Sequence, residues 1–191
     1  MTWSGAAGSS PSAQLAFFEN GVLENPIDIP YDRDNGPGRN ASPAVLIRGG
    51  TNFLAAWRTD APAGRGDAAN GSNAFVADEQ GNIVKRLYVD GTEKRIQQPE
   101  ACWDGAQYLV AWQETAYAES RAKPYLLIRA SRISSAGDVL AVENLSGSLE
   151  SPAAEPAIAS DGAGTSLIAY EKHSITASDP ITIAFRIWKK P

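Results

Sequence analysis

The sequence predicts an all-β fold with about three four-stranded antiparallel sheets and partial sheets at both termini. The main observation is a unit of about 56 residues that recurs along the chain. In addition, no segment combines a sustained helical spacing of apolar residues with helix caps. The 17 Gly, 12 Pro, five Trp and six Tyr among 191 residues suit sheets joined by many turns. A four-stranded unit of this length is typical of a propeller blade, so the predicted architecture is a β-propeller-like array.

The first half of the unit contains a proline, a short extended run, a glycine turn and an apolar run that ends in an aromatic residue. Its three copies span residues 43–57, 99–112 and 156–170, and their prolines lie 56 and 57 residues apart. An alanine precedes the final aromatic residue in every copy. We therefore predict two strands in each copy, the second of which packs its aromatic residue in the core. The three aromatic residues are Trp57, Trp112 and Tyr170.

The second half of the unit has two extended runs separated by a glycine. Residues 73–84 match residues 129–140, with that glycine at the same place in both. Glycine between two extended runs suits the positive φ of a tight hairpin turn, so this half predicts the third and fourth strands of each sheet. Residues 15–23 repeat this half, and residues 181–188 look like its first strand.

These copies predict one repeat domain that follows an N-terminal tail. The predicted bounds are 1–12 for the tail, 13–191 for the domain, 13–30 for a half-blade, and about 43–98, 99–155 and 156–191 for the repeats. The last repeat lacks a fourth strand. Residues 22–28, from the same chain or from a neighbouring copy, are candidates for that strand. Self-association of two chains into a six-bladed ring is one hypothesis, and a section of a longer propeller is the other.

Residues 99–140 carry a resemblance to a known group of proteins. They read Pro, apolar residues, Asp-Gly, Tyr-Leu-Val-Ala-Trp and, after a gap, Ala-Ser-Arg-Ile-Ser before a glycine. This pattern resembles the bacterial β-propeller repeat proteins, and the likeness extends over about residues 13–188. The resemblance implies the fold and says little about the function, because one fold serves many functions.

Charge and cysteine content exclude several functional classes. The net charge of −5 argues against nucleic-acid binding, which needs a clustered excess of Lys and Arg. Cys102 and His173 are the single residues of their types, so a cysteine-based zinc site cannot be built. The one candidate cofactor is Ca²⁺, which alternating oxygen ligands in one loop could bind. These ligands are Asp32, Asp34 and Asn35, for which an exposed turn is the competing interpretation.

The sequence gives limited information on location. No apolar run approaches the length of about 18 residues that a membrane span requires, so we expect a soluble chain without a membrane partner. The first five residues lack the features of a signal peptide. The compartment stays open, including secretion with a signal peptide that lies outside these residues.

Strand alternation places the long loops and the connections between repeats on one rim of the array. The long loops span about 59–72, 114–124 and 172–180. Because long irregular segments often carry function, we predict a non-catalytic binding module that recognises a glycan or a protein on this rim. Aromatic rings can stack on sugars, and arginine and acidic side chains can bind their hydroxyl groups. The candidate ligand-binding residues are Trp103, Trp188, Arg58, Glu114 and Glu171.

Two other functions stay open at this point. The chain is alternatively a section of a propeller glycoside hydrolase, in which a pair of rim carboxylates acts. The third interpretation is a structural subunit of an assembly, with its open terminal blades as the interface.

Cys102 is expected to be a small buried residue, and His173 a solvated loop residue. Basic residues on the third and fourth strands, Arg129 and Arg132 among them, are expected to be solvated edge charges.

Overall fold

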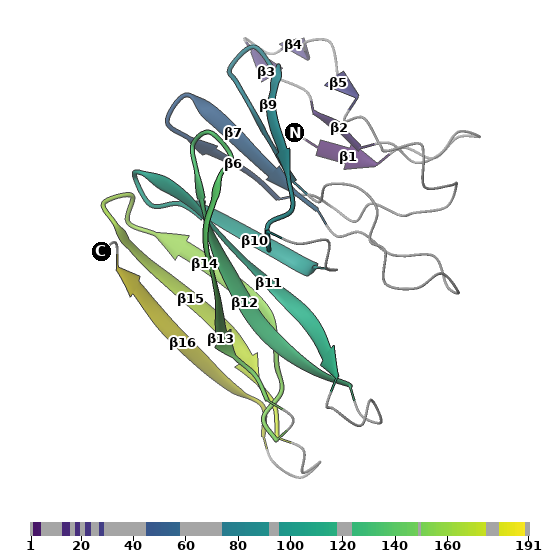
Figure 1. The fold of residues 1–191 in the computed structure, drawn as a ribbon, viewed down its shortest axis with the longest axis vertical. Helices are drawn as coiled ribbons and strands as arrows, with labels where there is room; N and C mark the ends of the chain where they lie inside the picture. Colours follow the sequence, from purple (N-terminus) through teal and green to yellow (C-terminus); the bar gives the residue numbers. More distant parts are fainter. Residues whose placement is uncertain are drawn as a thin grey trace, which may run out of the picture.

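The structure of the chain is a computed structural model. It describes residues 45–57, 74–91, 96–117, 124–148, 150–174 and 180–189, and the backbone of five short strands before them. All regular structure in these residues is β, as predicted. Eleven strands, β6 to β16, form three antiparallel sheets of four, four and three strands (Figure 1). No helix in the described part of the chain is long and apolar enough to cross a membrane.

Each of the three sheets is a meander, in which every strand pairs with the next strand along the chain. The first sheet contains β6 (Val45–Gly49), β7 (Asn52–Ala56), β8 (Ala74–Ala77) and β9 (Ile83–Leu87). The second contains β10 (Gln97–Trp103), β11 (Gln107–Tyr117), β12 (Pro124–Ser134) and β13 (Val139–Ser146). The third contains β14 (Ala153–Ser160), β15 (Thr165–Lys172) and β16 (Thr182–Lys189). The strand order within each sheet agrees with the order predicted from the repeat.

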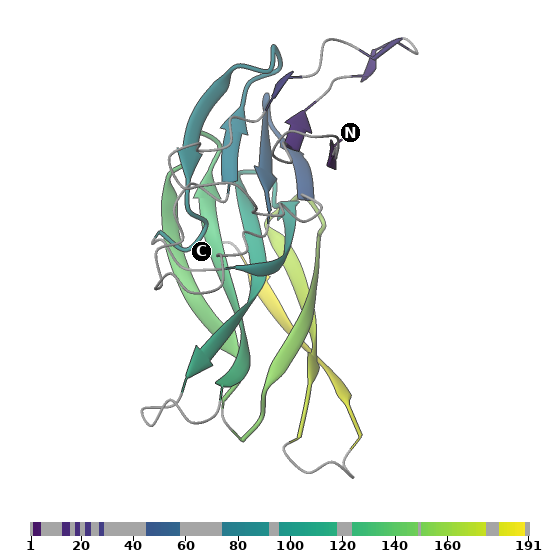
Figure 2. The same cartoon turned by 90° about the vertical axis from the view of Figure 1, so that its right-hand side faces the viewer.

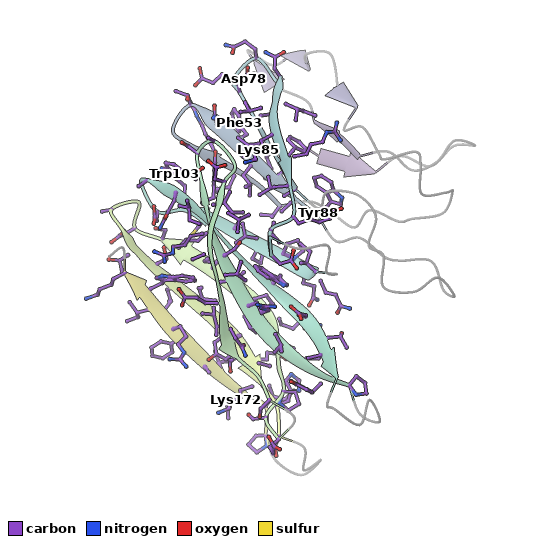
Figure 3. All side chains as sticks on the ribbon, in the orientation of Figure 1. Phe53, Asp78, Lys85, Tyr88, Trp103 and Lys172 are labelled. Carbon is purple, nitrogen blue, oxygen red and sulfur yellow. The ribbon has the colours of Figure 1, made fainter. Side chains whose placement is uncertain are left out.

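The three sheets are stacked face against face (Figures 1 and 2). β10 contacts β6 in the preceding sheet and β14 in the following one, so the first strands of successive sheets are neighbours. We call the face of a sheet toward the following sheet its front face and the opposite face its back face. The short turns lie at one end of the strands, the turn end, and the opposite end is the loop end. Trp103 and Lys172 mark these two ends (Figure 3).

The second strand of each sheet is apolar on both sides because it is packed on both sides. In β7, Leu54 and Ala56 lie in the core between the first and second sheets. Ala55 and Trp57 lie in a separate core on the back face of the first sheet. All four are at most 8% exposed. This double burial explains why the sequence shows a continuous apolar run instead of alternation.

The repeated aromatic residues have equivalent surroundings, which confirms their predicted packing role. Trp112, on the back face of the second sheet, is fully buried in the core that contains Leu54. Tyr170, on the back face of the third sheet, is 5% exposed and packs in a core with Ala111 of the second sheet. Trp112 and Tyr170 therefore each fill the junction with the preceding sheet, and Trp57 is buried on the back face of the first sheet. Cys102 is also buried, as expected.

Aspartates order the turns between the first and second strands. The Oδ1 atom of Asp104 accepts hydrogen bonds from the backbone N–H groups of Ala106 and Gln107, both at 2.8 Å. The equivalent Asp161 accepts the N–H groups of Thr165 and Ala163. Those bonds stabilise the ionised carboxylate and hold the pKa of Asp161 below its usual value. The repeated Asp-Gly pairs thus have a local structural role.

Five short strands lie in the region that was predicted to be a tail and a half-blade. β1 (Thr2–Ser4), inside the predicted tail, pairs with β2 (Ala13–Leu15), which also pairs with β5 (Ile27–Asp28). β3 (Phe18–Glu19) and β4 (Val22–Leu23) form a separate hairpin. In the described residues, Val22–Leu23 and Ile27–Asp28 therefore pair with β3 and β2 and not with β16, to which they were predicted to add a fourth strand. Pairing between strands this close in sequence has a lower entropy cost than pairing with the distant β16.

The loop between β11 and β12 is shorter than predicted. β11 continues to Tyr117, and β12 begins at Pro124. Glu114 therefore lies within a strand, opposite Leu127, and not in a loop. The strand pairing continues because residues 124–127 offer further backbone partners to residues 114–117.

Two equivalent glycines test the stacking of the sheets. Gly105 and Gly162 both have positive φ, at 98° and 69°. A Cβ on Gly105 would collide with the carbonyl oxygen of Gly162, whereas a Cβ on Gly162 would meet nothing within 4 Å. We expect Gly162→Ala to cost about 1 kcal/mol, and Gly105→Ala to cost about 1–3 kcal/mol more because the next sheet must shift. Urea unfolding measures both losses, and equal losses would contradict the close approach of the two turns.

Tyr108 gives a pH-dependent test of the same junction. It is fully buried, and its hydroxyl donates a 3.2 Å hydrogen bond to the carbonyl oxygen of Gly49 in the first sheet. Burial raises the pKa of Tyr108 to about 12. Since an unfolded tyrosine has a pKa of about 10, the contribution of Tyr108 to stability is complete below about pH 10. It is then lost as the pH rises toward about 12.

We therefore expect the free energy of unfolding to fall less steeply above about pH 10 in Tyr108→Phe than in the wild type. Urea unfolding at several alkaline pH values measures this slope. Tyr125→Phe controls for the loss of one phenol elsewhere in the chain. An unchanged slope in Tyr108→Phe would show that the phenol is not buried in the junction.

Candidate functional site

The junction between the second and third sheets contains an aromatic ring, a guanidinium group and a carboxylate. The Cζ atom of Arg132 on β12 lies 5.8 Å from the ring centroid of Trp188 on β16. Its Nη2 atom lies 4.0 Å from Oε1 of Glu143 on β13. The Arg132 and Glu143 side chains are 22% and 50% exposed. We call these three residues the junction cluster.

Strand register places the members of the junction cluster. Arg132 lies opposite Leu109 and Ala141 in the second sheet, with its side chain on the front face. Trp188 lies opposite Ser166 and is partly buried in the core between the second and third sheets. The two side chains meet because the front face of one sheet packs on the back face of the next.

Arg132 has one polar atom without a partner. Its buried Nε atom makes no hydrogen bond in the structure. A buried donor without an acceptor costs about 1–3 kcal/mol. The junction cluster thus combines an aromatic surface, hydrogen-bond donors and an acceptor carboxylate. Deeper in the same junction, the buried Cys102 has its Sγ atom 3.8 Å from Oγ of Ser166, and burial raises the pKa of Cys102.

A second polar group lies at the loop end, where β10 and β14 begin. Gln98 and Glu155 occupy the same place in their repeats, each directly before a proline. Both have positive φ, at 46° and 51°. A residue before proline prefers an extended backbone, so this conformation is strained by about 1–3 kcal/mol. Each lies in a β-bulge, where two residues of the first strand oppose one residue of the second.

Hydrogen bonds join these two bulges across the junction. The Gln98 amide donates to both carboxylate oxygens of Glu155, at 2.9 and 2.8 Å. The backbone N–H of Glu155 donates to Oε1 of Gln113, whose amide donates in turn to Oε1 of Gln97. Because strained backbone is often found at functional sites, this bulge network is a second candidate site.

The predicted ligand-binding residues do not form one site. Trp103 lies at the turn end, where its ring contacts Tyr108 edge to face, with centroids 4.8 Å apart. Trp188 also lies toward the turn end, whereas Glu114 and Glu171 lie toward the loop end of β11 and β15. The opposite ends of these strands keep the aromatic and acidic candidates apart. The predicted Arg58, Asp32, Asp34 and Asn35 lie outside the described residues.

The two acidic candidates each bind a basic side chain. Oε2 of Glu114 lies 3.1 Å from Nη1 of Arg129, and Oε2 of Glu171 lies 3.1 Å from Nε2 of His173. The backbone N–H of His173 also donates to the carbonyl oxygen of Pro152, and its side chain is 34% exposed, so this histidine is less solvated than the expected loop residue. Arg129 and Arg132 are 24% and 22% exposed. The prediction that they are solvated edge charges was therefore wrong, because neighbouring sheets cover the third strand.

The sequence analysis missed Glu143 and the bulge network, and gave Arg132 no site role. Gln98 and Glu155 carried a usable signal, since both are polar residues before the repeated proline. Arg132 carried none, because its proximity to Trp188 depends on how the sheets stack. No family model matches the chain, and neither the curated proteins nor the solved structures include a significant match.

Gln113 tests whether the bulge network stabilises the junction. The Gln113 side chain is 7% exposed and bonds both Gln97 and the backbone of Glu155. We expect Gln113→Leu to lower the free energy of unfolding by about 1–3 kcal/mol, because it leaves these partners unsatisfied. Gln80→Leu, at an exposed glutamine in the turn after β8, is the control and should cost no more than about 0.5 kcal/mol. Urea unfolding would contradict the network if the two variants lost equal stability.

Proposed function

We propose that the three sheets are successive blades of a propeller-like array, and that this array is a non-catalytic module that binds a glycan. Three features support the propeller arrangement. Each complete unit is a four-stranded meander, successive sheets stack through equivalent faces, and their first strands lie next to one another. Propeller blades have the same strand order and stack around their first strands.

The observation that carries the glycan proposal is the junction cluster. Sugars present patches of C–H groups that pack on aromatic rings, and hydroxyl groups that need donors and acceptors. Trp188 offers the ring, Arg132 offers guanidinium donors, and the half-exposed Glu143 offers acceptor oxygens.

We propose a non-catalytic module because of where the two described candidate carboxylates, Glu114 and Glu171, lie. A glycoside hydrolase needs one carboxylic acid and a second carboxylate on either side of the scissile bond. Glu114 and Glu171 instead lie on different sheets, and each has a basic partner beside it, Arg129 and His173 respectively. The alternative of a propeller hydrolase predicts turnover of an aryl glycoside, which our proposal does not.

Binding to a glycan array tests the proposal. We expect the wild type to bind a defined set of glycans, and Arg132→Lys or Glu143→Gln to weaken binding by about tenfold or more. Lysine keeps the charge of Arg132 but lacks the planar set of donors. Arg48→Lys, at an exposed ion pair with Glu79, is the matched control and should bind normally.

Two results would contradict this site. One is a wild type that binds no glycan, and the other is a set of junction variants that bind glycans as well as the wild type does. If Gln98→Ala and Glu155→Ala abolished binding instead, the site would be the bulge network at the loop end. The sequence analysis also predicted that a protein binds at the loop end. Loss of binding to a protein partner in Gln98→Ala and Glu155→Ala would support that alternative.

A further inference from the structure

The front face of the third sheet is apolar and exposed. Four large apolar side chains lie on it, Leu167, Ile183, Phe185 and Ile187, with exposed fractions of 45%, 70%, 65% and 60%. Leu167 lies directly opposite Ile187, and Phe185 lies opposite Ala169 on the neighbouring strand. The side chains therefore form one continuous surface. Monomeric proteins rarely leave such a patch open to water.

The equivalent positions in the other two sheets are covered. Leu54 and Leu109 occupy the place of Leu167 in their repeats, and they are 0% and 2% exposed. The following sheet covers each of them. The Phe185 position shows the same contrast, because its equivalents Ala74 and Ala130 are both fully buried. The exposed face of the third sheet thus continues an interface that the chain already forms twice.

β16 also has an open edge. β8 and β12, its equivalents, each pair with a strand on both sides, whereas in the described residues β16 pairs with β15 alone. An apolar strand with an unpaired edge promotes association with another chain.

We propose that this face is covered by the same face of a second copy of the chain, around a two-fold axis. A head-to-tail neighbour would have to use the back face of the first sheet. That face is already buried within the chain, where Trp57 and Phe75 are 8% and 1% exposed. The third sheet therefore finds its apolar partner surface in its own symmetry mate, which is the commonest arrangement of homodimers.

Charges at the two ends of the face set the orientation of the second copy. Glu171 follows the apolar side chains of β15 toward the loop end, and Lys189 follows those of β16 toward the turn end. Both belong to the alternating set of residues that forms the front face. A two-fold axis perpendicular to the strands places Glu171 of one copy near Lys189 of the other. An axis parallel to the strands would bring like charges to the same end, which is unfavourable.

The size of the face predicts a weak dimer. Three strands of eight residues cover roughly 14 by 26 Å at the usual strand spacing and rise. Interfaces of this size fall toward the small end of the specific class, below about 1,200 Å² in total. We therefore expect a dimer whose population rises with protein concentration.

Sedimentation velocity over a wide range of protein concentration tests the proposal. We expect the wild type to shift from monomer to dimer, and Phe185→Lys to stay monomeric at concentrations where the wild type is dimeric. Leu140→Lys replaces a 56% exposed leucine on the second sheet and should dimerise as the wild type does. A wild type that is monomeric throughout, or a Phe185→Lys protein that dimerises normally, would overturn the proposal. So would an assembly larger than a dimer, because a two-fold face closes on itself.

A charge exchange tests the orientation separately. Glu171→Lys should weaken the dimer, and the added change Lys189→Glu should restore it, because the pair is re-formed with reversed signs. Failure of the second change to restore the dimer would exclude the perpendicular axis. Neither test depends on glycan binding.

Discussion

The structure depends on burial of the second strand of each sheet between two neighbouring sheets. Leu54 and Ala56 are excluded from water by the second sheet, and Trp112 fills the same junction from the other side. This burial removes apolar surface on both faces of a strand, which is the largest favourable contribution to folding. It also explains the small alanines beside each aromatic residue, because sheets can approach closely only where one side presents small side chains. The cores between the first and second sheets and between the second and third sheets both result from this form of packing.

The same stacking creates the candidate sites. A guanidinium group from one sheet meets an indole ring from the next only because front and back faces are in contact, as Arg132 and Trp188 show. The bulges before the repeated prolines have a related origin. They place Gln98 and Glu155 side by side at the loop end, in strained backbone conformations that the surrounding pairing maintains. The third sheet differs from the others in that it has three strands and that its front face has no covering sheet among the described residues.

Local patterns in the sequence predicted the strands and their order, because each strand needs only neighbouring residues to specify it. The hairpin glycines, the apolar runs and the buried aromatic residues were all readable in this way. The sites were less predictable. Arg132 was interpreted as an edge charge because the residue that packs on it, Trp188 on β16, lies 56 positions later in the sequence. Glu114 was placed in a loop because pairing between two long strands continues beyond the apolar pattern that marks them.

The most direct test of the account is a double-mutant cycle across the first junction, with Leu54→Ala on β7 and Trp112→Phe on β11. The two residues lie in one core but belong to different sheets. If the sheets stack as described, the two losses of unfolding free energy are coupled by roughly 1 kcal/mol in urea unfolding. If the losses add to within about 0.3 kcal/mol, the two side chains do not share a core and the stacking of the sheets is wrong.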